Sequence, residues 1–319
     1  MTDEILNRAR EGAPLNKRDA IALLSIGNLS PGFYALLAAA NAASRERYRN
    51  RGYIFAQIGV NSAPCNGNCR FCSFARDSFS VDAQYEKSAA QVLSEARAVA
   101  AEGIDALFLM TTADFDQDEF IRIGQAVRYI LPQGVQLIAN VGDFNAGYAA
   151  RLRAAGFSGA YHIVRLREGT DTDISPQTRV ATLDAIKSAG LELFYCVEPI
   201  GREHTYDEIA EEMLRARDYG VDVMAVMARV GVRGTRYEGA EPISELELTK
   251  IAAVARLVTD PKKSMNVHEP RQTPLLAGVN QLYAEYGANP RDTSAQTSQS
   301  RGFDTARVRA MLRGAEWEI

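Results

Sequence analysis

Three cysteines lie close together in residues 63–77, whose sequence is APCNGNCRFCSFARD. Cys65, Cys69 and Cys72 have a C-x3-C-x2-C spacing, and Cys196 is the one other cysteine in the chain. Three thiolates on one short loop can converge on a single metal centre. Clusters that only transfer electrons normally have every iron of a [4Fe–4S] cube bound by a protein thiolate. The missing fourth ligand therefore predicts a [4Fe–4S] cluster with chemistry at one open iron.

A structural zinc site is the main alternative for this loop. Such sites are closed by four ligands, usually as two C-x2-C pairs or as one such pair followed by two histidines. No histidine lies near the loop, and Cys196 is far away in sequence. The spacing favours the cluster over zinc, and over three unrelated buried cysteines.

The composition is that of an ordinary soluble globular protein, with 46% apolar and 24% charged residues in 319. A net charge of −4 gives no indication of nucleic-acid binding. No run of 18 apolar residues predicts a membrane span, and the polar N-terminus lacks the apolar core of a signal peptide. Clustered cysteines without such a signal are typical of metal ligands in a reducing compartment, so we expect a cytoplasmic protein.

From residue 53 onward, short apolar runs alternate with amphipathic stretches that carry helix caps. Ser88 with Gln91, Asp116 with Glu119 and Thr205 with Glu208 each have the spacing of a capping box. The predicted strands cover 53–59, 105–111, 136–141, 159–164, 192–197, 222–228, 264–267 and 281–285.

Eight strands alternating with helices predict an α/β fold, a parallel (βα)8 TIM-type barrel. A doubly wound sheet is the alternative, because periodicity alone does not decide whether the sheet closes. In a barrel the active site lies at the C-terminal ends of the strands. The cysteine loop follows the first strand, so its metal is expected at that mouth.

The two ends of the chain differ from the barrel. Residues 1–50 predict an N-terminal helical extension, with one helix beginning at Ser30-Pro31, and the barrel is expected over 51–290. Residues 291–319 predict a polar tail followed by a C-terminal helix capped near Asp304. The segment NPRDTSAQTSQSRG has no apolar period and predicts a surface loop.

The segment CNGNCRFCSF resembles the signature of radical S-adenosylmethionine (SAM) enzymes, in which an aromatic residue, here Phe71, precedes the last cysteine. The resemblance implies a cluster whose open iron chelates SAM, and one-electron cleavage of SAM to a 5′-deoxyadenosyl radical. Over about residues 50–290 the strand order and local patterns resemble the biotin synthase subgroup. That subgroup includes biotin synthase, an [FeFe]-hydrogenase maturase and methylornithine synthase.

The resemblance also implies residues that bind SAM. Phe71 matches the aromatic residue near adenine. Thr111 and Thr112 end the second barrel strand, where family members bind the SAM amino group. Asn140 and Gly142 match a polar-x-Gly pattern after the third strand.

Charged residues follow the fourth strand and open the next helix. Glu168, with Arg165 and Arg167 beside it, resembles the acidic residue that contacts SAM. Arg179 resembles the arginine that pairs with the SAM carboxylate, which suits the bidentate geometry of a guanidinium group. By residue type alone, an arginine such as Arg179 is more often a solvated surface residue, and Glu168 could be part of an exposed ion pair.

Several residues are candidates for the substrate side. Phe194, Cys196 and Glu198 alternate along the fifth strand, so they share one face. Cys196 could donate a hydrogen atom to a radical or be a small buried hydrophobe. Glu198 could bind a substrate ammonium group or pair with Arg229. His268 could bind substrate or move a proton, or could simply be solvated.

Biotin synthase carries a second cluster, and the resemblance puts apolar residues such as Leu107 and Phe194 at the matching places. One remaining cysteine cannot build that cluster. We therefore predict hydrogen abstraction from a small metabolite, in a rearrangement, epimerisation or related reaction of cofactor or amino-acid-derived biosynthesis. Biotin synthase-like sulfur insertion and a non-catalytic iron–sulfur carrier are the alternatives. The expected electron donor is a ferredoxin or flavodoxin. We expect no nucleic-acid or membrane partner. The sequence does not decide the oligomeric state, and a homodimer is one of the alternatives.

Overall fold

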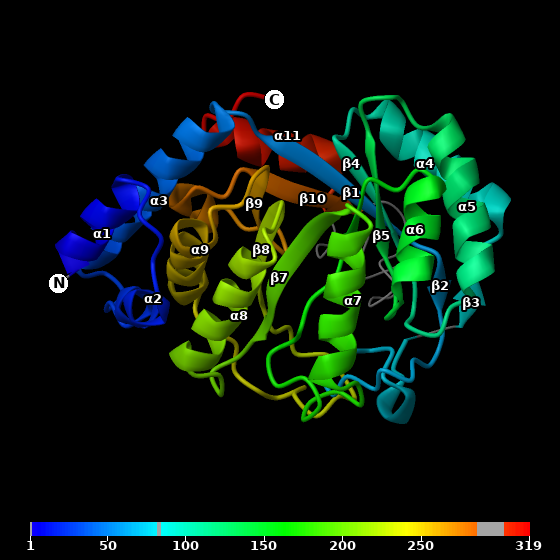
Figure 1. Ribbon diagram of the computed structural model, residues 1–319, viewed down its shortest axis with the longest axis horizontal. Helices are drawn as coiled ribbons and strands as arrows, with labels where there is room; N and C mark the ends of the chain where they lie inside the picture. Colours follow the sequence, from blue (N-terminus) through cyan, green and yellow to red (C-terminus); the bar gives the residue numbers. More distant parts are fainter. Residues whose placement is uncertain (1, 82–83, 286–302) are drawn as a thin grey trace.

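Residues 2–81, 84–285 and 303–319 are described by the computed structural model. Their parallel strands form a closed barrel in the order β1-β10-β9-β8-β7-β6-β5-β4 (Figure 1). The predicted (βα)8 barrel is therefore confirmed, and the doubly wound alternative is wrong. The barrel strands are β1 (Tyr53–Gly59), β4 (Ala106–Met110), β5 (Gln136–Asn140), β6 (Gly159–Tyr161), β7 (Glu192–Ile200), β8 (Val223–Ala228), β9 (Ser264–Val267) and β10 (Gln281–Glu285).

Two strands end three residues away from their predicted ends, and the other strand ends agree within one residue. The predicted strand 159–164 is shorter, because the backbone N–H of Val164 donates to the Tyr195 hydroxyl oxygen rather than to a neighbouring strand. β7 extends beyond 197 to Ile200, with a shift of register against β8 after Val197. This extension carries Glu198 to the mouth of the barrel.

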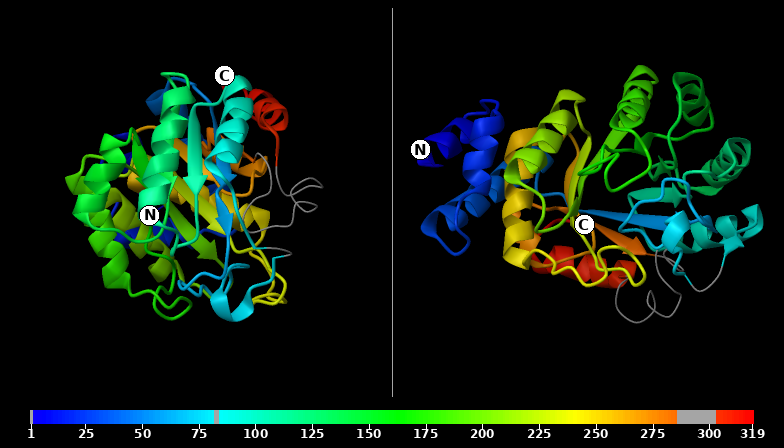
Figure 2. Two further views of the ribbon diagram at one scale, coloured as in Figure 1. Left: turned by 90° about the vertical axis from the view of Figure 1, so that its right-hand side faces the viewer. Right: turned by 90° about the horizontal axis from the view of Figure 1, so that it is seen from below.

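Helices cover the outside of the barrel (Figure 2). They are α4 (Ala89–Ala101), α5 (Gln117–Ile130), α6 (Ala146–Ala154), α7 (Pro176–Ser188), α8 (Tyr206–Asp218) and α9 (Glu245–Thr259). The capping boxes predicted at Ser88 with Gln91 and at Thr205 with Glu208 are confirmed.

The third predicted capping box is only half formed. The Asp116 side chain accepts a hydrogen bond from the Glu119 N–H, which caps α5. The Glu119 carboxylate instead accepts from Arg122 Nε at 2.7 Å, one turn further along the helix. A charged partner on the helix surface thus competes successfully with the N-cap backbone N–H.

The N-terminal helices are α1 (Thr2–Arg10), α2 (Lys17–Leu24) and α3 (Pro31–Tyr48). Helix α2 packs against α8 and α9, α3 packs against α9, and α1 packs on α2 and α3 (Figure 2). Gly278, with φ +83°, ends the short helix η2 (Thr273–Ala277) where a Cβ would lie 2.6 Å from the Ala40 carbonyl oxygen of α3. Only glycine permits this approach.

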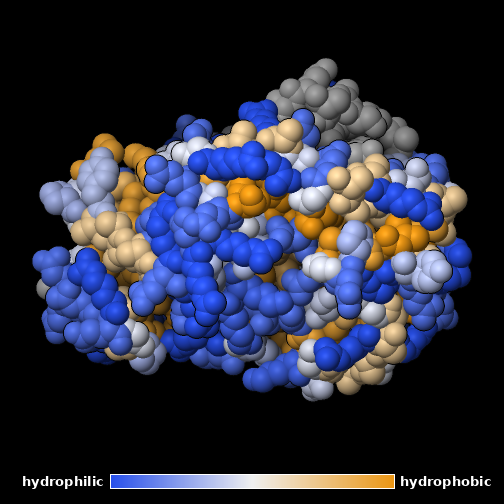
Figure 3. All heavy atoms as spheres, turned by 90° about the horizontal axis from the view of Figure 1, so that it is seen from above, coloured by the Kyte–Doolittle hydropathy of each residue, from blue (hydrophilic) through white to orange (hydrophobic). Residues whose placement is uncertain are grey.

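The chain ends with α11 (Thr305–Gly314), capped by Asp304 as predicted, which packs against β1 and β10. The predicted surface loop at 289–302 lies outside the described residues. On the face seen from above, hydrophilic residues predominate and apolar residues are scattered among them (Figure 3). Among the helices of the described part, none is long and apolar enough to cross a bilayer.

A layer of aromatic rings fills the middle of the barrel. Phe55, Phe108, Phe194 and Tyr283 contact one another with ring centroids 5.0–6.0 Å apart. Such tilted and edge-to-face contacts are the preferred packing of aromatic side chains. This layer closes the barrel below its C-terminal mouth, so ligands can enter from one end.

Candidate active site

A cavity opens at the C-terminal ends of the strands, where Cys65, Cys69 and Cys72 all contribute to its wall. It encloses about 1380 Å³, its open mouth included. The cavity brings the three cysteines together with residues from the ends of several strands, where barrel enzymes have their active sites.

Backbone and side-chain hydrogen bonds fix the cysteine loop. The Cys65 N–H donates to the Phe74 carbonyl oxygen at 2.7 Å, which closes the loop on itself. The Asn68 amide donates to Asp77 and to Asp173, each at 2.8 Å. Because Asp173 follows β6, the loop after β1 is tied to a distant segment of the barrel rim.

Two of the loop sulfurs accept hydrogen bonds from the backbone. Ala113 N–H donates to Cys65 Sγ and Phe74 N–H to Cys72 Sγ, both at 3.4 Å. Hydrogen bonds of this kind tune the potential of iron–sulfur clusters. Burial raises the pKa of the Cys69 thiol to about 12, and the nearby positive charge of Arg165 lowers it only in part.

The three loop cysteines do not form the compact donor group expected of a single metal ion. Within the described part of the chain, the group whose donor atoms all lie within 4.8 Å of one another is Cys196, Glu198 and His268, not the loop cysteines. Four ligands around one zinc, with Zn–S near 2.3 Å, would bring the sulfurs to about 3.8 Å of one another. The loop cysteines line one cavity without forming such a compact group, so the structure gives a single zinc ion no support.

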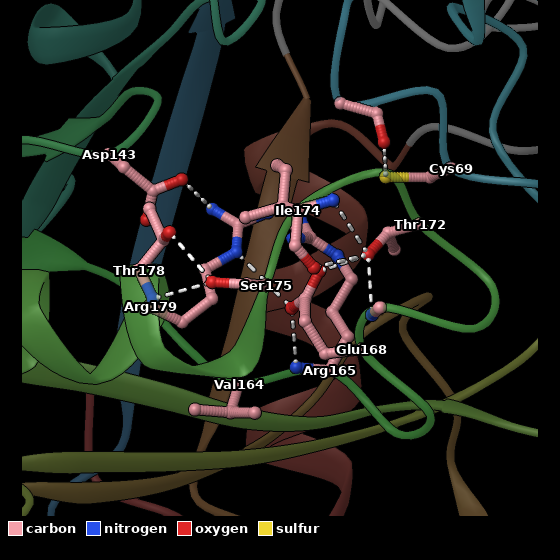
Figure 4. Close-up of polar contacts among 12 residues, drawn as sticks. Cys69, Asp143, Val164, Arg165, Glu168, Thr172, Ile174, Ser175, Thr178 and Arg179 are labelled. Atoms are coloured by element: carbon pink, nitrogen blue, oxygen red, sulfur yellow. Dashed lines mark hydrogen bonds and ion pairs between the residues drawn. The ribbon is translucent and has the colours of Figure 1, made fainter.

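Arg179 reaches this cavity from the first turn of α7 and is almost fully buried (Figure 4). Its Nε donates to Glu168 at 3.2 Å, and its Nη1 donates to Asp143 at 3.1 Å. A guanidinium group has five N–H donors, so two carboxylates fix its plane and leave donors for a ligand. The alternative of a solvated surface arginine is wrong.

Glu168 lies behind Arg179 and not on the cavity wall. Its carboxylate accepts hydrogen bonds from Thr172 Oγ1 at 2.5 Å and from the Arg165 backbone N–H at 2.9 Å, in addition to Arg179. The side chain is fully buried. The alternative of an exposed ion pair is therefore wrong, and the predicted contact with SAM stays a prediction.

Asp143 and His162 belong to the same network and were missed in the sequence. His162 Nε2 lies 3.2 Å from Asp143 Oδ1, and Thr182 Oγ1 donates to the same oxygen at 3.2 Å. Burial disfavours the ionised carboxyl, but His162 and Arg179 hold the pKa of Asp143 at about 2. Burial also lowers the pKa of His162, so its ring is neutral near pH 7. The position of Asp143, just after Gly142 at a strand end, was the available signal.

The two threonines after β4 have different surroundings. Thr112 is held by Asn61, which donates to its hydroxyl oxygen at 2.8 Å and accepts from its backbone N–H at 2.9 Å. Thr111 lines the cavity, and its buried hydroxyl has no hydrogen-bond partner among the described residues. Thr111 is thus the better placed of the two to bind a ligand.

Phe71, Asn140 and Gly142 also line the cavity, beside the cysteines. A Cβ at Gly142 would lie 2.3 Å from the Ala113 carbonyl oxygen, so only glycine fits there. The polar-x-Gly pattern thus reflects close packing of two backbone segments. The predicted SAM-binding residues, apart from Glu168, share this wall.

Another part of the cavity wall carries Glu198 and His268. Glu198 Oε1 lies 3.8 Å from Arg165 Nε, and its Oε2 lies 4.0 Å from His268 Nδ1. The alternative in which Glu198 pairs with Arg229 is wrong, because Arg229 pairs with Glu203 in the loop after β7. Arg229 still lines the cavity, with its guanidinium group 4.2 Å from the centre of the Tyr237 ring.

Phe194 and Cys196 lie deeper, on the same face of β7. Phe194 belongs to the aromatic layer, and the structure does not bring it to the cavity wall. Cys196 is fully buried, but its sulfur lies within 4.8 Å of donor atoms of Glu198 and His268. His268 is held between Tyr161 and Tyr283, with ring centroids 5.7 and 5.0 Å away, so it is not a solvated loop residue.

Comparison with known families identifies the chain. The Radical SAM superfamily model matches residues 63–246, which begin just before the cysteine loop and cover more than half of the sequence. The chain belongs to the radical SAM superfamily. The family resemblance of the cysteine motif is thereby confirmed.

Relatives of this radical SAM protein include biotin synthases. The chain is 27% identical to the biotin synthase of Nocardioides sp. over 266 residues, which cover 80% of this chain and 70% of the relative. It is 26% identical to that of Desulforudis audaxviator over 263 residues, 80% of this chain and 79% of the relative. The biotin synthase-like resemblance is confirmed at this level.

Solved structures show the same fold. Methylornithine synthase (PylB) matches with a TM-score of 0.82 and 18% identity, over 98% of this chain and 95% of PylB. HydG, a maturase of the [FeFe]-hydrogenase, also matches with a TM-score of 0.82, at 15% identity, over 98% of this chain and 74% of HydG. At these identities the likeness concerns architecture alone.

Membership in the radical SAM superfamily implies a [4Fe–4S] cluster and SAM. The residues of this cavity fit both groups: three thiols line it, and its lining also includes an arginine held by two carboxylates and a threonine whose hydroxyl group has no partner among the described residues. Cys65, Cys69 and Cys72 would hold the cluster.

Proposed function

We propose that this radical SAM protein cleaves SAM reductively at a [4Fe–4S] cluster held by Cys65, Cys69 and Cys72, and abstracts hydrogen from a small metabolite. The observation that carries the proposal is that all three thiols share one large cavity with Arg179 and Glu198. When bound, the cluster and SAM supply the radical chemistry, while the protein orients the reactants and excludes water.

The clamped arginine supports the assignment of the SAM side. Nε and Nη1 of Arg179 are held by two carboxylates, so its remaining N–H groups have a fixed direction. A charge-assisted fork of this kind suits the SAM carboxylate. Asn140 and the Thr111 hydroxyl group, on the same wall, are proposed to bind the amino group or ribose of SAM.

Glu198, His268 and Arg229 are proposed to hold the substrate. They come from β7 and from the segments just after β9 and β8, at strand ends where barrel enzymes carry their specificity. The aromatic layer beneath them seals the lower end of the barrel, which supports the exclusion of water. The reaction proposed is a rearrangement, epimerisation or related C–H chemistry.

The biotin synthase relatives favour a second candidate, sulfur insertion. Insertion from a sacrificial second cluster would need further cysteines, and the sequence has only Cys196 outside the loop. We therefore favour reactions that need one cluster. A ferredoxin or flavodoxin is the proposed electron donor, and the cytoplasm the proposed location.

The test is anaerobic reconstitution followed by reduction with dithionite in the presence of SAM. We expect 5′-deoxyadenosine from the wild type, and expect Cys69→Ala to lose the cluster absorbance and the product together. A non-catalytic carrier would hold the cluster without forming 5′-deoxyadenosine. Continued SAM cleavage by Cys69→Ala would contradict the assignment.

A further inference from the structure

A second set of metal-binding side chains lies at the floor of the cavity, apart from the cysteine loop. Donor atoms of Cys196, Glu198 and His268 all lie within 4.8 Å of one another. Cys196 and Glu198 stand two residues apart on β7, so both point into the barrel, and His268 follows the last residue of β9. The proposed function does not assign a metal ion to this combination of sulfur, oxygen and nitrogen donors.

Neighbouring groups already orient two of these side chains. Tyr161 stacks on the His268 ring at 5.7 Å with an interplanar angle of 22°, while Tyr283 meets it edge-on at 5.0 Å. Arg165 approaches Oε1 of Glu198, whereas Oε2 is the oxygen nearer to His268. Metal ligands are commonly held in this way by a second shell of partners.

We infer that Cys196, Glu198 and His268 bind one divalent transition-metal ion. A thiolate, an imidazole and a carboxylate together suit zinc, cobalt(II) or iron(II), and the thiolate disfavours magnesium and calcium. Tetrahedral binding would bring Nδ1 of His268 and Oε2 of Glu198 from 4.0 Å to about 3.3 Å, given metal–ligand bonds near 2.0 Å. Small side-chain rotations supply that change.

The fourth position of such an ion faces the cavity. Glu198 and His268 line the cavity wall, and Cys196 lies behind them. Sites with three protein ligands and one open position are typical of catalytic metals, which bind an oxygen, nitrogen or sulfur atom of a ligand. The ion would therefore anchor a Lewis-basic group of the molecule that enters the cavity. This inference goes beyond the proposed function and does not depend on SAM cleavage.

Cobalt(II) is the probe, in a full-length variant with Cys65, Cys69 and Cys72 all changed to alanine. Cys196 is then the only thiol in the chain. We expect one equivalent of cobalt(II) and a thiolate-to-cobalt charge-transfer band, which Cys196→Ser abolishes. His268→Ala and Glu198→Gln should each weaken binding at least about tenfold. His204→Gln, a buried histidine outside the cavity wall, should retain the band.

A folded triple variant that shows no charge-transfer band would overturn the inference. Thermal unfolding and circular dichroism establish whether the variant is folded.

The second measurement uses the reconstituted holoenzyme after incubation with zinc and gel filtration. We expect one zinc per chain in addition to the iron, and its loss in Cys196→Ser with the cluster absorbance retained. A wild-type holoenzyme with iron and sulfide but no zinc would also overturn the inference.

Discussion

The two walls of the cavity hold their charged groups in different ways. On the wall of Arg179, the carboxylates of Glu168 and Asp143 accept hydrogen bonds of 2.5 to 3.2 Å from Arg179 and Thr172. This network is buried behind the cavity wall. On the other wall, the Glu198 carboxylate lies 3.8 Å from Arg165 and 4.0 Å from His268, and aromatic rings set the direction of the His268 ring. Hydrogen bonds therefore fix Arg179 before a ligand binds, whereas the spacing around Glu198 leaves it room to move toward a bound group.

This difference indicates which ligand each wall binds. A cofactor common to a family needs one fixed geometry, and preorganised hydrogen bonds provide it without reorganisation on binding. A substrate or an ion that differs between relatives is bound more easily by side chains that have room to move. Substitutions that disturb each wall in turn can separate the two roles.

The largest effect is expected for Arg179→Ala. Loss of a charged fork should weaken SAM binding roughly a hundredfold. Glu168 and Asp143 would be left buried without their cation, lowering the free energy of unfolding by about 3–5 kcal/mol. Equilibrium binding of SAM to the reconstituted, unreduced protein measures the first effect, and chemical denaturation the second.

Arg256 provides a matched control, because it is equally buried but lies outside the cavity, bound to Ser44 and Asp260. Arg256→Ala should destabilise the fold and leave the SAM affinity of the folded protein unchanged. Arg179→Lys keeps the charge without the fork, so its SAM affinity should be intermediate. Unaltered SAM binding by Arg179→Ala would remove the distinction between the walls.

A smaller effect is expected from acid. The pKa of Asp143 lies at about 2 in the folded protein, below its ordinary value of 3.8. A lowered folded-state pKa adds stability above the unfolded pKa, and this stability is lost as the pH falls from about 4 to 2, amounting to about 2 kcal/mol. Thermal unfolding of the cluster-free protein between pH 5 and pH 2 should show this loss, and Asp143→Asn should reduce it. An identical pH dependence in Asp143→Asn would contradict the network.

This network also marks the limit of what the sequence could predict. The barrel strands could be predicted because short apolar runs alternate with amphipathic stretches along the sequence. The metal loop could be predicted because its three cysteines lie within eight residues. The clamp joins Arg179 to Asp143, 36 residues away and on another element, and no periodicity encodes that contact. Arg179 itself could be proposed only because its position resembles a family pattern.

The wrong partner of Glu198 has the same origin. Glu198 directly follows the predicted strand 192–197 and Arg229 the predicted strand 222–228, so their pairing was a reasonable expectation from charge. The loop after β7 instead places Glu203 against Arg229, while Arg165 turns to Glu198. Loop conformation decides which of several nearby charged side chains form ion pairs. The residue types along the sequence do not reveal that conformation.

A still smaller effect is expected for Thr182→Val. The change removes the hydrogen bond to Asp143 at 3.2 Å and the oxygen that accepts the Phe144 N–H, also at 3.2 Å. We expect a loss of about 1–2 kcal/mol in the free energy of unfolding. Thr182→Ser keeps the hydroxyl group and is the control. Equal stability of the valine and serine variants would show that the hydroxyl contributes little to the wall of Arg179.

The smallest effect is expected on SAM affinity in Glu198→Gln. If the two walls act independently, removing this charge should change the SAM dissociation constant by no more than about twofold, as for sites without shared partners. Arg165 connects the two walls, because its Nε faces Glu198 while its backbone N–H binds Glu168. Calorimetric titration with SAM measures the constant, and Glu269→Gln at the same cavity gives the background for loss of a negative charge. A tenfold change confined to Glu198→Gln would mean that Arg165 transmits the state of the substrate wall to the arginine clamp.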